Sequence, residues 1–226
     1  MNVKSFLQEL KQKGRRNLTE NEAMQILSKY GIKVVNGSVV KKFEEAVQIA
    51  EKVGYPIVLK IVSKDVLHKT NVGGVIVNIN SSEELETAYN KLLKNAKSLN
   101  ISLEGVFVQK MLKGYYEVIV GGKRDKVFGP TVMFGLGGIF VEVLEDISLR
   151  IAPIDLKEAV KMIEETKAVK ILKGVRGEKA NINEIAKTLT RVSRIMVENP
   201  EIAELDINPL MVKDEAIATD ARIILF

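Results

Sequence analysis

Apolar residues recur along the chain in two patterns, one with the spacing of amphipathic helices and one with the continuous runs of buried strands. Thr19 and Glu22 have the spacing of a capping box, and Ala23, Ile26 and Leu27 then follow on one helical face. The same spacing predicts a short amphipathic helix at the N-terminus and further helices over 43–53, 82–99, 157–165 and 183–198.

Strands are predicted between these helices. The runs that indicate them are 32–40, 56–62, 75–79, 106–111, 118–120, 127–134, 202–212 and 216–225. Gly121 to Asp125 is expected to turn one hairpin, and Lys213 to Glu215 the last one. The simplest division is two α+β lobes, an N-terminal lobe of residues 1–108, including the N-terminal helix, and a C-terminal lobe of residues 109–226.

The composition excludes several kinds of chemistry. The chain has no cysteine, which excludes disulfides, cysteine nucleophiles and thiolate metal sites. Its only histidine is His68, which excludes a zinc site built on several imidazoles. Any histidine chemistry must therefore fall on that one residue.

The charge balance suits an anionic partner without identifying one. The formal net charge is +5, but the lysines are dispersed, there is no Trp, and aromatic residues are 5% of the chain. A solvated lysine-rich surface is therefore favoured over nucleic-acid binding. The longest uncharged run, Val127 to Val141, is too short and too rich in glycine to span a membrane, and the N-terminus lacks the apolar core of a signal peptide. We expect a cytoplasmic protein without membrane contact.

Lys60 is the first candidate for chemistry, because it ends a strand that is otherwise apolar. A cation fixed there suits a phosphate. A lysine at a strand end also commonly extends to solvent, and Lys60 alone would favour that second interpretation.

The segment from His68 to Val75 is the second candidate. Gly73 and Gly74 would let the backbone approach a phosphate, with Lys69 and Thr70 beside it. The spacing is not that of a Walker A loop, and a bare Gly-Gly pair more often marks an ordinary hairpin turn. A neutral imidazole is a competent nucleophile toward phosphorus, although a lone loop histidine is more often a surface or hydrogen-bonding residue.

The third candidate is a group of oxygen-bearing side chains near the C-terminus. Strand alternation places Glu204, Asp206 and Asn208 on one face, and Asp220 on the return strand can lie opposite Asn208. Oxygen ligands without histidine or cysteine are typical of Mg²⁺ that also binds a nucleotide phosphate. Metal binding is favoured over a solvent-facing edge strand.

Four segments together resemble an ATP-grasp domain: 56–60, 68–75, 128–142 (FGPTVMFGLGGIFVE) and 204–210 (ELDINPL). They are most similar to the β subunits of ADP-forming acetyl-CoA and other acyl-CoA synthetases, which are related to succinyl-CoA synthetase β. The resemblance extends from about Leu18 to Phe226. It implies an α+β ATP-grasp fold with the nucleotide bound between two lobes.

The resemblance also implies roles for single residues near the nucleotide phosphates. Lys60 matches a lysine that contacts them. His68, Lys69 and Thr70 match the stretch that covers them, and a histidine at the position of His68 is proposed in that family to carry phosphate transiently.

Other implied roles concern adenine and the metal. Gln109, Lys110 and Met111 match the hinge between the lobes, where backbone groups read adenine, and Glu117 matches a glutamate near the nucleotide. The magnesium ligands implied by the resemblance are Asn208 and Asp220, with Asp206 where succinyl-CoA synthetase β has Glu. Two arginines in matching segments, Arg150 and Arg176, are equally consistent with a phosphate or interface role and with surface salt bridges.

The implied reaction is acyl-CoA + ADP + phosphate ⇌ carboxylate + CoA + ATP, with Mg²⁺ as cofactor. A CoA-binding α subunit with its own phosphohistidine would be the partner, in an α2β2 assembly. The chain has no room for a CoA-binding domain, so it is expected to bind nucleotide without completing the reaction alone. The acyl group and the choice between ADP and GDP stay open.

Two other functions are kept open. One is a different ATP-grasp carboxylate ligase, such as a carboxylate–amine ligase, which would not need His68. The other is a non-catalytic nucleotide-sensing module of an acyltransferase assembly, which would bind nucleotide without exchanging a phosphoryl group.

Overall fold

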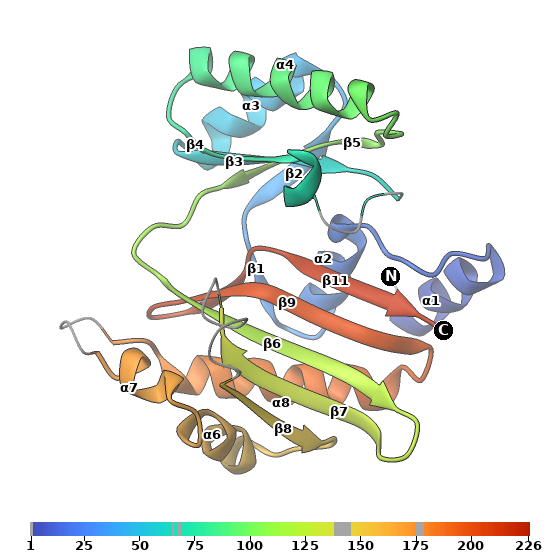
Figure 1. Ribbon diagram of the computed structural model, residues 1–226, viewed down its shortest axis with the longest axis vertical. Helices are drawn as coiled ribbons and strands as arrows, with labels where there is room; N and C mark the ends of the chain where they lie inside the picture. The colour runs from blue at the N-terminus through green and yellow to red at the C-terminus, as the bar shows by residue number, and fades with distance from the viewer. Residues whose placement is uncertain (1, 65, 67–68, 138–145, 175–178) are drawn as a thin grey trace. The chain divides into compact units, whose positions relative to one another are not determined.

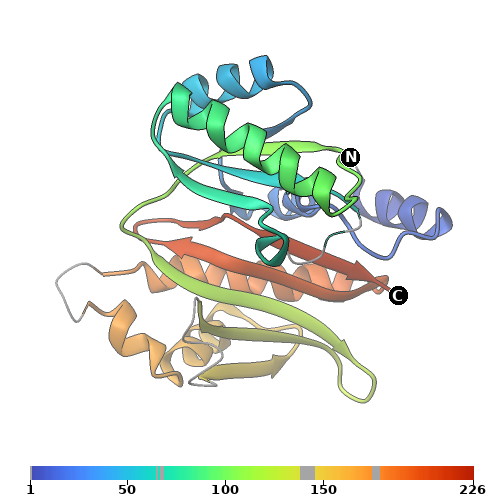
Figure 2. The same cartoon turned by 45° about the horizontal axis from the view of Figure 1, so that its top comes forward.

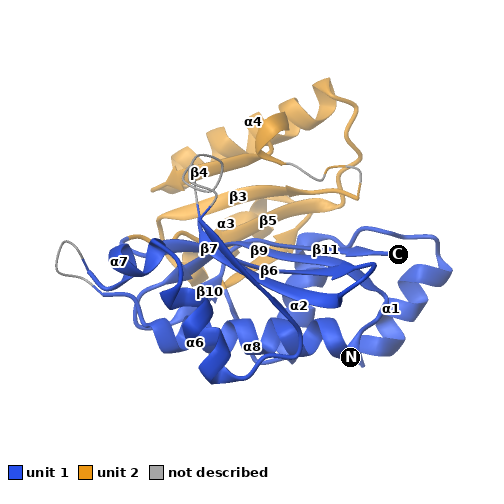
Figure 3. Ribbon diagram, turned by 60° about the horizontal axis from the view of Figure 1, so that its bottom comes forward, with its two compact units in different colours: residues 1–34, 114–226 blue, residues 35–113 orange. Residues whose placement is uncertain are grey.

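The computed structural model describes residues 2–64, 66, 69–137, 146–174 and 179–226 of the chain, which has an α+β fold. It divides into two compact units, each with its own sheet (Figure 3). Unit 1 consists of Met1–Val34 and Gly114–Phe226, and unit 2 of Val35–Lys113. No helix among the described residues is long and apolar enough to cross a membrane.

Unit 2 is a four-stranded antiparallel sheet with two helices on one face (Figure 1). In sheet order its strands are β2 (Gly37–Val40), β5 (Gly105–Lys110), β3 (Ile57–Val62) and β4 (Val75–Ile79), and its helices are α3 (Phe43–Val53), α4 (Ser82–Ser98) and the short η1 (Thr70–Val72). Leu59 and Ile61 of β3 pack against Ala46 of α3 and Leu85 of α4 in one core. The helical spacing of the sequence therefore corresponds to this buried helix layer.

Unit 1 contains a seven-stranded sheet in the order β1-β10-β9-β6-β7-β8, with β11 paired to β9. The strands are β1 (Lys33–Val34), β10 (Ala216–Ala218), β9 (Ile202–Val212), β11 (Ala221–Leu225), β6 (Tyr116–Asp125), β7 (Gly129–Leu136) and β8 (Ile147–Ile151). The helices are α1 (Val3–Gln12), α2 (Glu20–Lys29), α6 (Leu156–Glu164), α7 (Ala168–Leu172) and α8 (Ile182–Glu198).

One face of the unit 1 sheet is closed by helices. Figures 1 and 2 show α8 running along the back of β6 and β7, with α6 beside it. Val120 and Phe134 are fully buried on this face, together with Leu189 and Met196 of α8. In the middle of β9, buried Leu205 and Ile207 alternate with less buried neighbours, so the sheet has a closed face against the helices and an open face.

The first 34 residues belong to unit 1, whereas the sequence pattern grouped them with the N-terminal lobe. Leu7 and Leu10 of α1 lie in the core of unit 1. Strand β1 pairs in parallel with β10, and the Leu18 N–H donates to the Ile223 carbonyl at 3.1 Å. Amphipathic spacing predicts that these segments bury a face, but it does not reveal which distant strands they meet. At the other boundary, β5 and the residues up to Lys113 stay with unit 2.

Most predicted helices and strands are present, but the expected turn at Gly121–Asp125 is wrong. Strand β6 continues through both glycines to Asp125, and the turn lies just after it. Asp125 Oδ1 accepts hydrogen bonds from the N–H groups of Val127 and Phe128, at 2.7 and 2.9 Å. The glycine pair marks a close approach within a strand, and the aspartate marks the turn. Helix α7 and strand β8 were not predicted.

Candidate functional site

The open face of β9 presents the oxygen-bearing side chains that the sequence placed together. Leu205 and Ile207 point into the core of unit 1 and are almost fully buried. Their neighbours Glu204, Asp206 and Asn208 therefore lie on the opposite side of the strand. The alternation predicted for this strand is confirmed.

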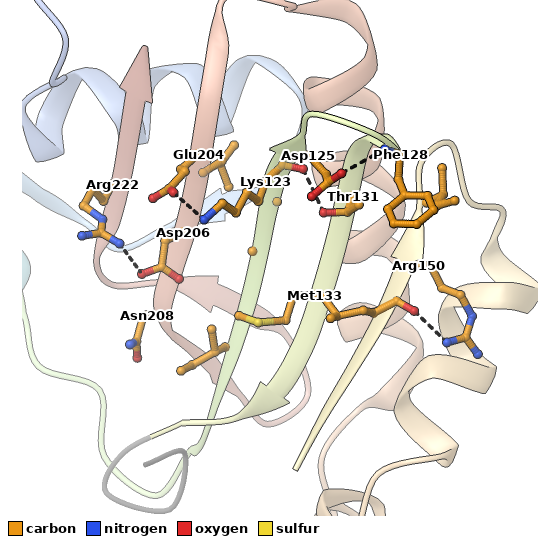
Figure 4. A pocket seen from close by; sticks show the side chains of 16 residues that line it. Lys123, Asp125, Phe128, Thr131, Met133, Arg150, Glu204, Asp206, Asn208 and Arg222 are labelled. Atoms are coloured by element: carbon orange, nitrogen blue, oxygen red, sulfur yellow. Dashed lines mark hydrogen bonds and ion pairs between the residues drawn. The ribbon is translucent and has the colours of Figure 1, made fainter. Parts of the chain in front are cut away.

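A pocket of about 730 Å³ lies over this open face, and the residues that line it all belong to unit 1. Figure 4 shows Asp206, Asn208 and Glu204 on one side of it, near Arg222 and Lys123. Its other side is formed by residues of β7, β8 and the β6–β7 turn. The pocket is thus polar over β9 and β11 and more apolar over β7 and β8.

The floor of the pocket includes Gly121, whose neighbour Gly122 faces the helices. A Cβ atom on Gly122 would lie 2.5 Å from Met196 Cγ in α8, so only glycine fits there without a shift. A Cβ on Gly121 would meet the Leu205 carbonyl oxygen at 3.3 Å and Met133 Cε at 3.5 Å. Gly122 therefore serves packing, whereas Gly121 leaves space above the floor of the pocket.

The carboxylate of Asp206 lies mostly buried among other charged groups of the pocket, and its pKa is shifted. Burial raises its pKa, the nearby Arg222 guanidinium lowers it, and the carboxylates of Asp220 and Glu204 raise it further, with a net shift upward. Arg222 stands directly opposite Asp206 in the β9–β11 register, with 3.9 Å between its Nη2 and Asp206 Oδ2. A partly buried carboxylate in this position is stabilised by added positive charge.

Asp220 lies in the short break between β10 and β11. Its carbonyl oxygen accepts a hydrogen bond from the Asn208 N–H at 3.3 Å, so the two residues are neighbours across the hairpin. Asp220 does not line the pocket, while Asp206 and Asn208 do. Within the described ranges, no three His, Cys, Asp or Glu side chains form a metal-binding group, so Asn208 or a ligand oxygen would have to complete any such site.

Arg150 is bound to the helix layer. Its Nε donates to Glu158 at 2.7 Å, and its Nη2 donates to Glu165 at 2.6 and 2.7 Å. These hydrogen bonds lower the pKa of both glutamates, and they raise that of Arg150. The salt-bridge interpretation of Arg150 is the one consistent with this geometry. Arg176 lies outside the described residues.

In unit 2, Lys60 is the fourth residue of the six in β3 and is 5% exposed. The expectation that it ends the strand is therefore wrong. Its strand neighbours Leu59 and Ile61 point into the helix-covered core, so Lys60 belongs to the other face of the sheet. Gln109 of β5 shares that face, because it stands opposite Val58 while Lys60 stands opposite Phe107.

Gln109 has an unusual environment for an amide. The residue is 3% exposed, and its Oε1 has no hydrogen-bond partner among the residues that the structure describes. A buried acceptor without a partner costs roughly 1–3 kcal/mol. The side chain is therefore prepared for a donor that a ligand could supply.

In the loop before β4, the local structure requires glycine at both Gly73 and Gly74. Gly73 ends η1 with φ of 63°, and a Cβ on Gly74 would lie 2.6 Å from Ile61 Cδ1. The Gly74 N–H donates to the Lys69 carbonyl at 2.8 Å, and Thr70 begins η1 with an exposed side chain. Lys69 and Thr70 are thus held beside each other in a tight turn. His68 lies outside the described residues.

The residues after β5 are fixed by hydrogen bonds within unit 2. The Met111 N–H donates to the Pro56 carbonyl at 3.0 Å, and Lys110 Nζ donates to the carbonyls of Gly54 and Tyr55 at 2.8 and 2.9 Å. The Met111 N–H is therefore already used by the fold. Glu117 is in unit 1, exposed on β6.

Comparison with known proteins agrees with this architecture. Residues 9–225 match the model of the ATP-grasp domain family. The chain is 49% identical over 214 residues to the β subunit of acetate–CoA ligase [ADP-forming] I from Pyrococcus furiosus, covering 93% of this chain and 92% of that subunit. The chain belongs to the ATP-grasp β subunits of ADP-forming acetate–CoA ligases.

Solved structures of acetyl-coenzyme A synthetase 1 from Ca. Korarchaeum cryptofilum have the same fold as this β subunit. One, in complex with coenzyme A and Ca-AMPCP, is 46% identical, with a TM-score of 0.95 and full coverage of both chains. Another is 44% identical, with a TM-score of 0.86 and full coverage of both chains. It contains coenzyme A and Mg-AMPPCP, with its phosphohistidine segment pointing towards the nucleotide binding site. The α+β ATP-grasp fold expected from the sequence is confirmed.

The residues of the pocket that sequence reasoning missed in this β subunit include Gly121, Lys123 and Arg222. Lys123 pairs with Glu204 at 3.1 Å, and Arg222 stands beside Asp206. For Arg222 a signal was available, because it lies on the return strand two residues after Asp220. Gly121 was assigned to a turn, and only the continuous strand reveals its place on the pocket floor.

Proposed function

We propose that this chain is the nucleotide-binding subunit of an ADP-forming acyl-CoA synthetase. It accepts a phosphoryl group from a phosphohistidine on a CoA-binding partner and passes it to ADP. The observation that carries this proposal is the polar half of the unit 1 pocket, where Asp206 and Asn208 lie together in a chain of this family.

The chemical step is a phosphoryl transfer between nitrogen and oxygen. The P–N bond of phosphohistidine breaks, and a P–O bond to a β-phosphate oxygen of ADP forms. The imidazole nitrogen recovers the electron pair of the broken bond and takes up a proton. Such a transfer needs mainly positioning and charge neutralisation, which fixed cations and backbone groups supply.

Asp206, Asn208 and Asp220 are the residues that we assign to Mg²⁺. Two carboxylates and an amide are the oxygen donors that Mg²⁺ takes when nucleotide phosphates and water complete its shell. The raised pKa of Asp206 fits this assignment, because a cation would relieve the cost of its buried charge. When bound, Mg²⁺ neutralises phosphate charge and orients the nucleotide.

Unit 2, taken by itself, offers groups for the nucleotide. Lys60 is a buried cation suited to a phosphate, and Lys69 and Thr70 form the tight turn that we assign to the phosphate-covering stretch. The partnerless Oε1 of Gln109 can accept a hydrogen bond from a base. For Met111 the N–H is already used, so a carbonyl or the side chain would make the contact.

Glu117 and His68 complete the assignment. Glu117 is exposed at the start of β6, two residues before Ile119 on the pocket floor. His68 is assigned the role of transient phosphate carrier from its place in the sequence, directly before Lys69. In that role, the P–N bond on the partner breaks as a P–N bond to His68 forms, and the proton that His68 loses goes to the imidazole that leaves. The second transfer, from His68 to ADP, is the one described above.

The partner that we infer is a CoA-binding α subunit, in an α2β2 assembly. The β-subunit relative from Pyrococcus furiosus is named as one subunit of its ligase, and the Ca. Korarchaeum cryptofilum structures contain coenzyme A. The partner, rather than this chain, would select the acyl group.

Phosphorylation of the chain tests the proposal directly. The chain is incubated with [γ-³²P]ATP and MgCl₂, and we expect an acid-labile, base-stable adduct that disappears on addition of unlabelled ADP. His68→Ala should abolish the adduct, and Asn208→Ala should reduce it strongly. Arg194→Met is the control, because Arg194 lies on α8 away from the pocket and is bonded to Glu198, and its adduct should match that of the parent.

Other outcomes of this experiment would contradict the assignment. A base-labile adduct would indicate an acyl phosphate, as in a carboxylate ligase that works without a phosphohistidine. Nucleotide binding without any adduct or exchange would indicate a sensing module. An adduct of unchanged yield in His68→Ala would contradict the role of His68 as transient phosphate carrier.

A further inference from the structure

Strand β8 carries a row of exposed apolar side chains on the open face of the unit 1 sheet. Ile147, Leu149 and Ile151 are 44%, 55% and 55% exposed, at alternate positions of the strand. The residues between them, Ser148 and Arg150, have their partners on the helix-covered side. Among the described strands, β8 is the outermost on its side of the sheet. Edge strands are usually protected by charged residues, and the open face of this one is not.

This row continues into the pocket. Leu149 stands opposite Met133 of β7 in the strand register, and Phe128, at the turn before β7, is 63% exposed. We call Phe128, Met133, Leu149 and Ile151 the apolar wall, since all four line the same pocket as Asp206 and Asn208. Figure 4 shows Phe128 on the side of the pocket away from Asn208, with Met133 between them.

Charge alone would hold a docking segment weakly in this pocket. Lys123 is paired with Glu204, and Arg222 is close to Asp206, so both cations already face carboxylates. The nucleotide phosphates and Mg²⁺ would use the polar half of the pocket. The apolar wall has no part in that binding. Exposed apolar surface of this kind is typical of sites where another polypeptide docks.

We propose that the apolar wall is the docking surface for the partner segment that carries the phosphohistidine, an inference that rests on the proposed function. The donor phosphorus must come within bonding distance of ADP beside Asp206 and Asn208, so the polypeptide around the histidine must lie over adjacent surface of the same pocket. In the Ca. Korarchaeum cryptofilum enzyme, a phosphohistidine segment points towards the nucleotide binding site. The segment that fits this wall carries apolar residues beside its histidine.

A docking role predicts a specific kinetic signature. The wall would contribute to holding the phosphorylated segment and not to binding Mg-ADP or to breaking the P–N bond. Removing its apolar groups should therefore raise KM for the phosphorylated partner, while kcat at saturation stays nearly unchanged.

The test uses the double variant Leu149→Thr with Ile151→Thr. Threonine is β-branched, a shape that strands favour, so the strand is preserved while apolar surface is lost. The matched control is Leu99→Thr, because Leu99 is 53% exposed and lies in unit 2 at the end of α4. Melting temperature and Mg-ADP affinity, measured by calorimetry, establish that each variant is folded.

The donor is the CoA-binding subunit of the same organism, phosphorylated on its histidine with acetyl-CoA and ³²P-labelled phosphate. We expect KM for this donor to rise about tenfold in the double variant, as for loss of well-placed interface residues, and to stay unchanged in Leu99→Thr. An unchanged KM in the double variant would overturn the docking surface, provided that the parent chain transfers label. If the parent transfers no label to ADP, the proposed function itself fails.

Two further outcomes identify a different occupant and also overturn the proposal. A loss of Mg-ADP affinity in the double variant would assign the apolar wall to the base or ribose of the nucleotide. A change in the oligomeric state of the isolated chain, measured by analytical ultracentrifugation, would assign it to a second copy of this chain.

Discussion

The two faces of the unit 1 sheet differ most clearly at Gly121 and Gly122, which are adjacent in the chain and face opposite sides. On the closed face, Gly122 is required because Met196 fills the space that a Cβ would occupy. On the open face, the atoms of the described residues nearest to such a Cβ are the Leu205 carbonyl oxygen at 3.3 Å and Met133 Cε at 3.5 Å. The difference teaches that the same residue type in one strand can serve packing on one side and a binding pocket on the other.

The largest effect expected from this comparison is on the closed face, at Phe134. This side chain is fully buried against the helices and is among the largest in the core. Phe134→Ala should lower the free energy of unfolding by about 3–5 kcal/mol, because it removes apolar burial and leaves a cavity. Urea denaturation measures the change. A loss below 1 kcal/mol would mean that the closed face is not close-packed.

The next effect is smaller and distinguishes overpacking from loss of contacts. Gly122→Ala would place a methyl group 2.5 Å from Met196 Cγ, so Met196 or the strand must move. We expect a destabilisation of about 1–3 kcal/mol, the usual range for added volume in a packed core. In a Met196→Ala background, Gly122→Ala should cost less free energy of unfolding than it does in the parent, because the clashing side chain is gone. A double-mutant cycle in the same urea titration measures this coupling, and equal costs in the two backgrounds would contradict the assigned clash.

A still smaller effect concerns the ion pairs that fasten β8 to the helix layer. Arg150 lowers the pKa of Glu158 and Glu165 below their ordinary value of 4.5, so these pairs add stability above pH 4.5 that is lost as the pH falls through the lowered pKa values. Arg150→Met lacks this contribution. Melting curves should therefore show the parent more stable near neutral pH and the two proteins converging in acid. A constant difference across that range would contradict the assignment.

The smallest effect is expected on the open face. Gly121→Ala should lower the free energy of unfolding by only about 0.5 kcal/mol, because the Leu205 carbonyl oxygen, 3.3 Å from such a Cβ, has to move by only a few tenths of an ångström. The same urea titration, run beside Gly122→Ala, measures it. Equal losses of unfolding free energy in the two variants would contradict the difference between the closed and the open face.

Local features of the fold were predictable from the sequence because they depend on neighbours in the chain. The capping box at Thr19 and Glu22 forms as expected, with hydrogen bonds in both directions. Helix α3 begins at Phe43 and ends at Val53, as its spacing indicates. The alternation of β9 also placed Asp206 and Asn208 on one face.

Features that depend on distant partners were not predictable in the same way. The pairing of β1 with β10 joins residues far apart in the chain, and no local pattern specifies it. Lys60 was placed at the end of a strand although the predicted run extends to Val62, and the pairing with β5, which sets Lys60 opposite Phe107, shows its interior position. The proximity of Arg222 to Asp206 depends on strand register, which a single sequence fixes only where a turn is short and well defined.

The division of unit 1 into Met1–Val34 and Gly114–Phe226 has a consequence for the order in which the protein can be made. Unit 2 is continuous in the chain, so it can complete its own sheet while later residues are still being synthesised. Helix α2 and strand β1 are synthesised before unit 2, but their partners β11 and β10 are synthesised after it. These two segments must therefore wait until unit 2 has been made before they can be buried.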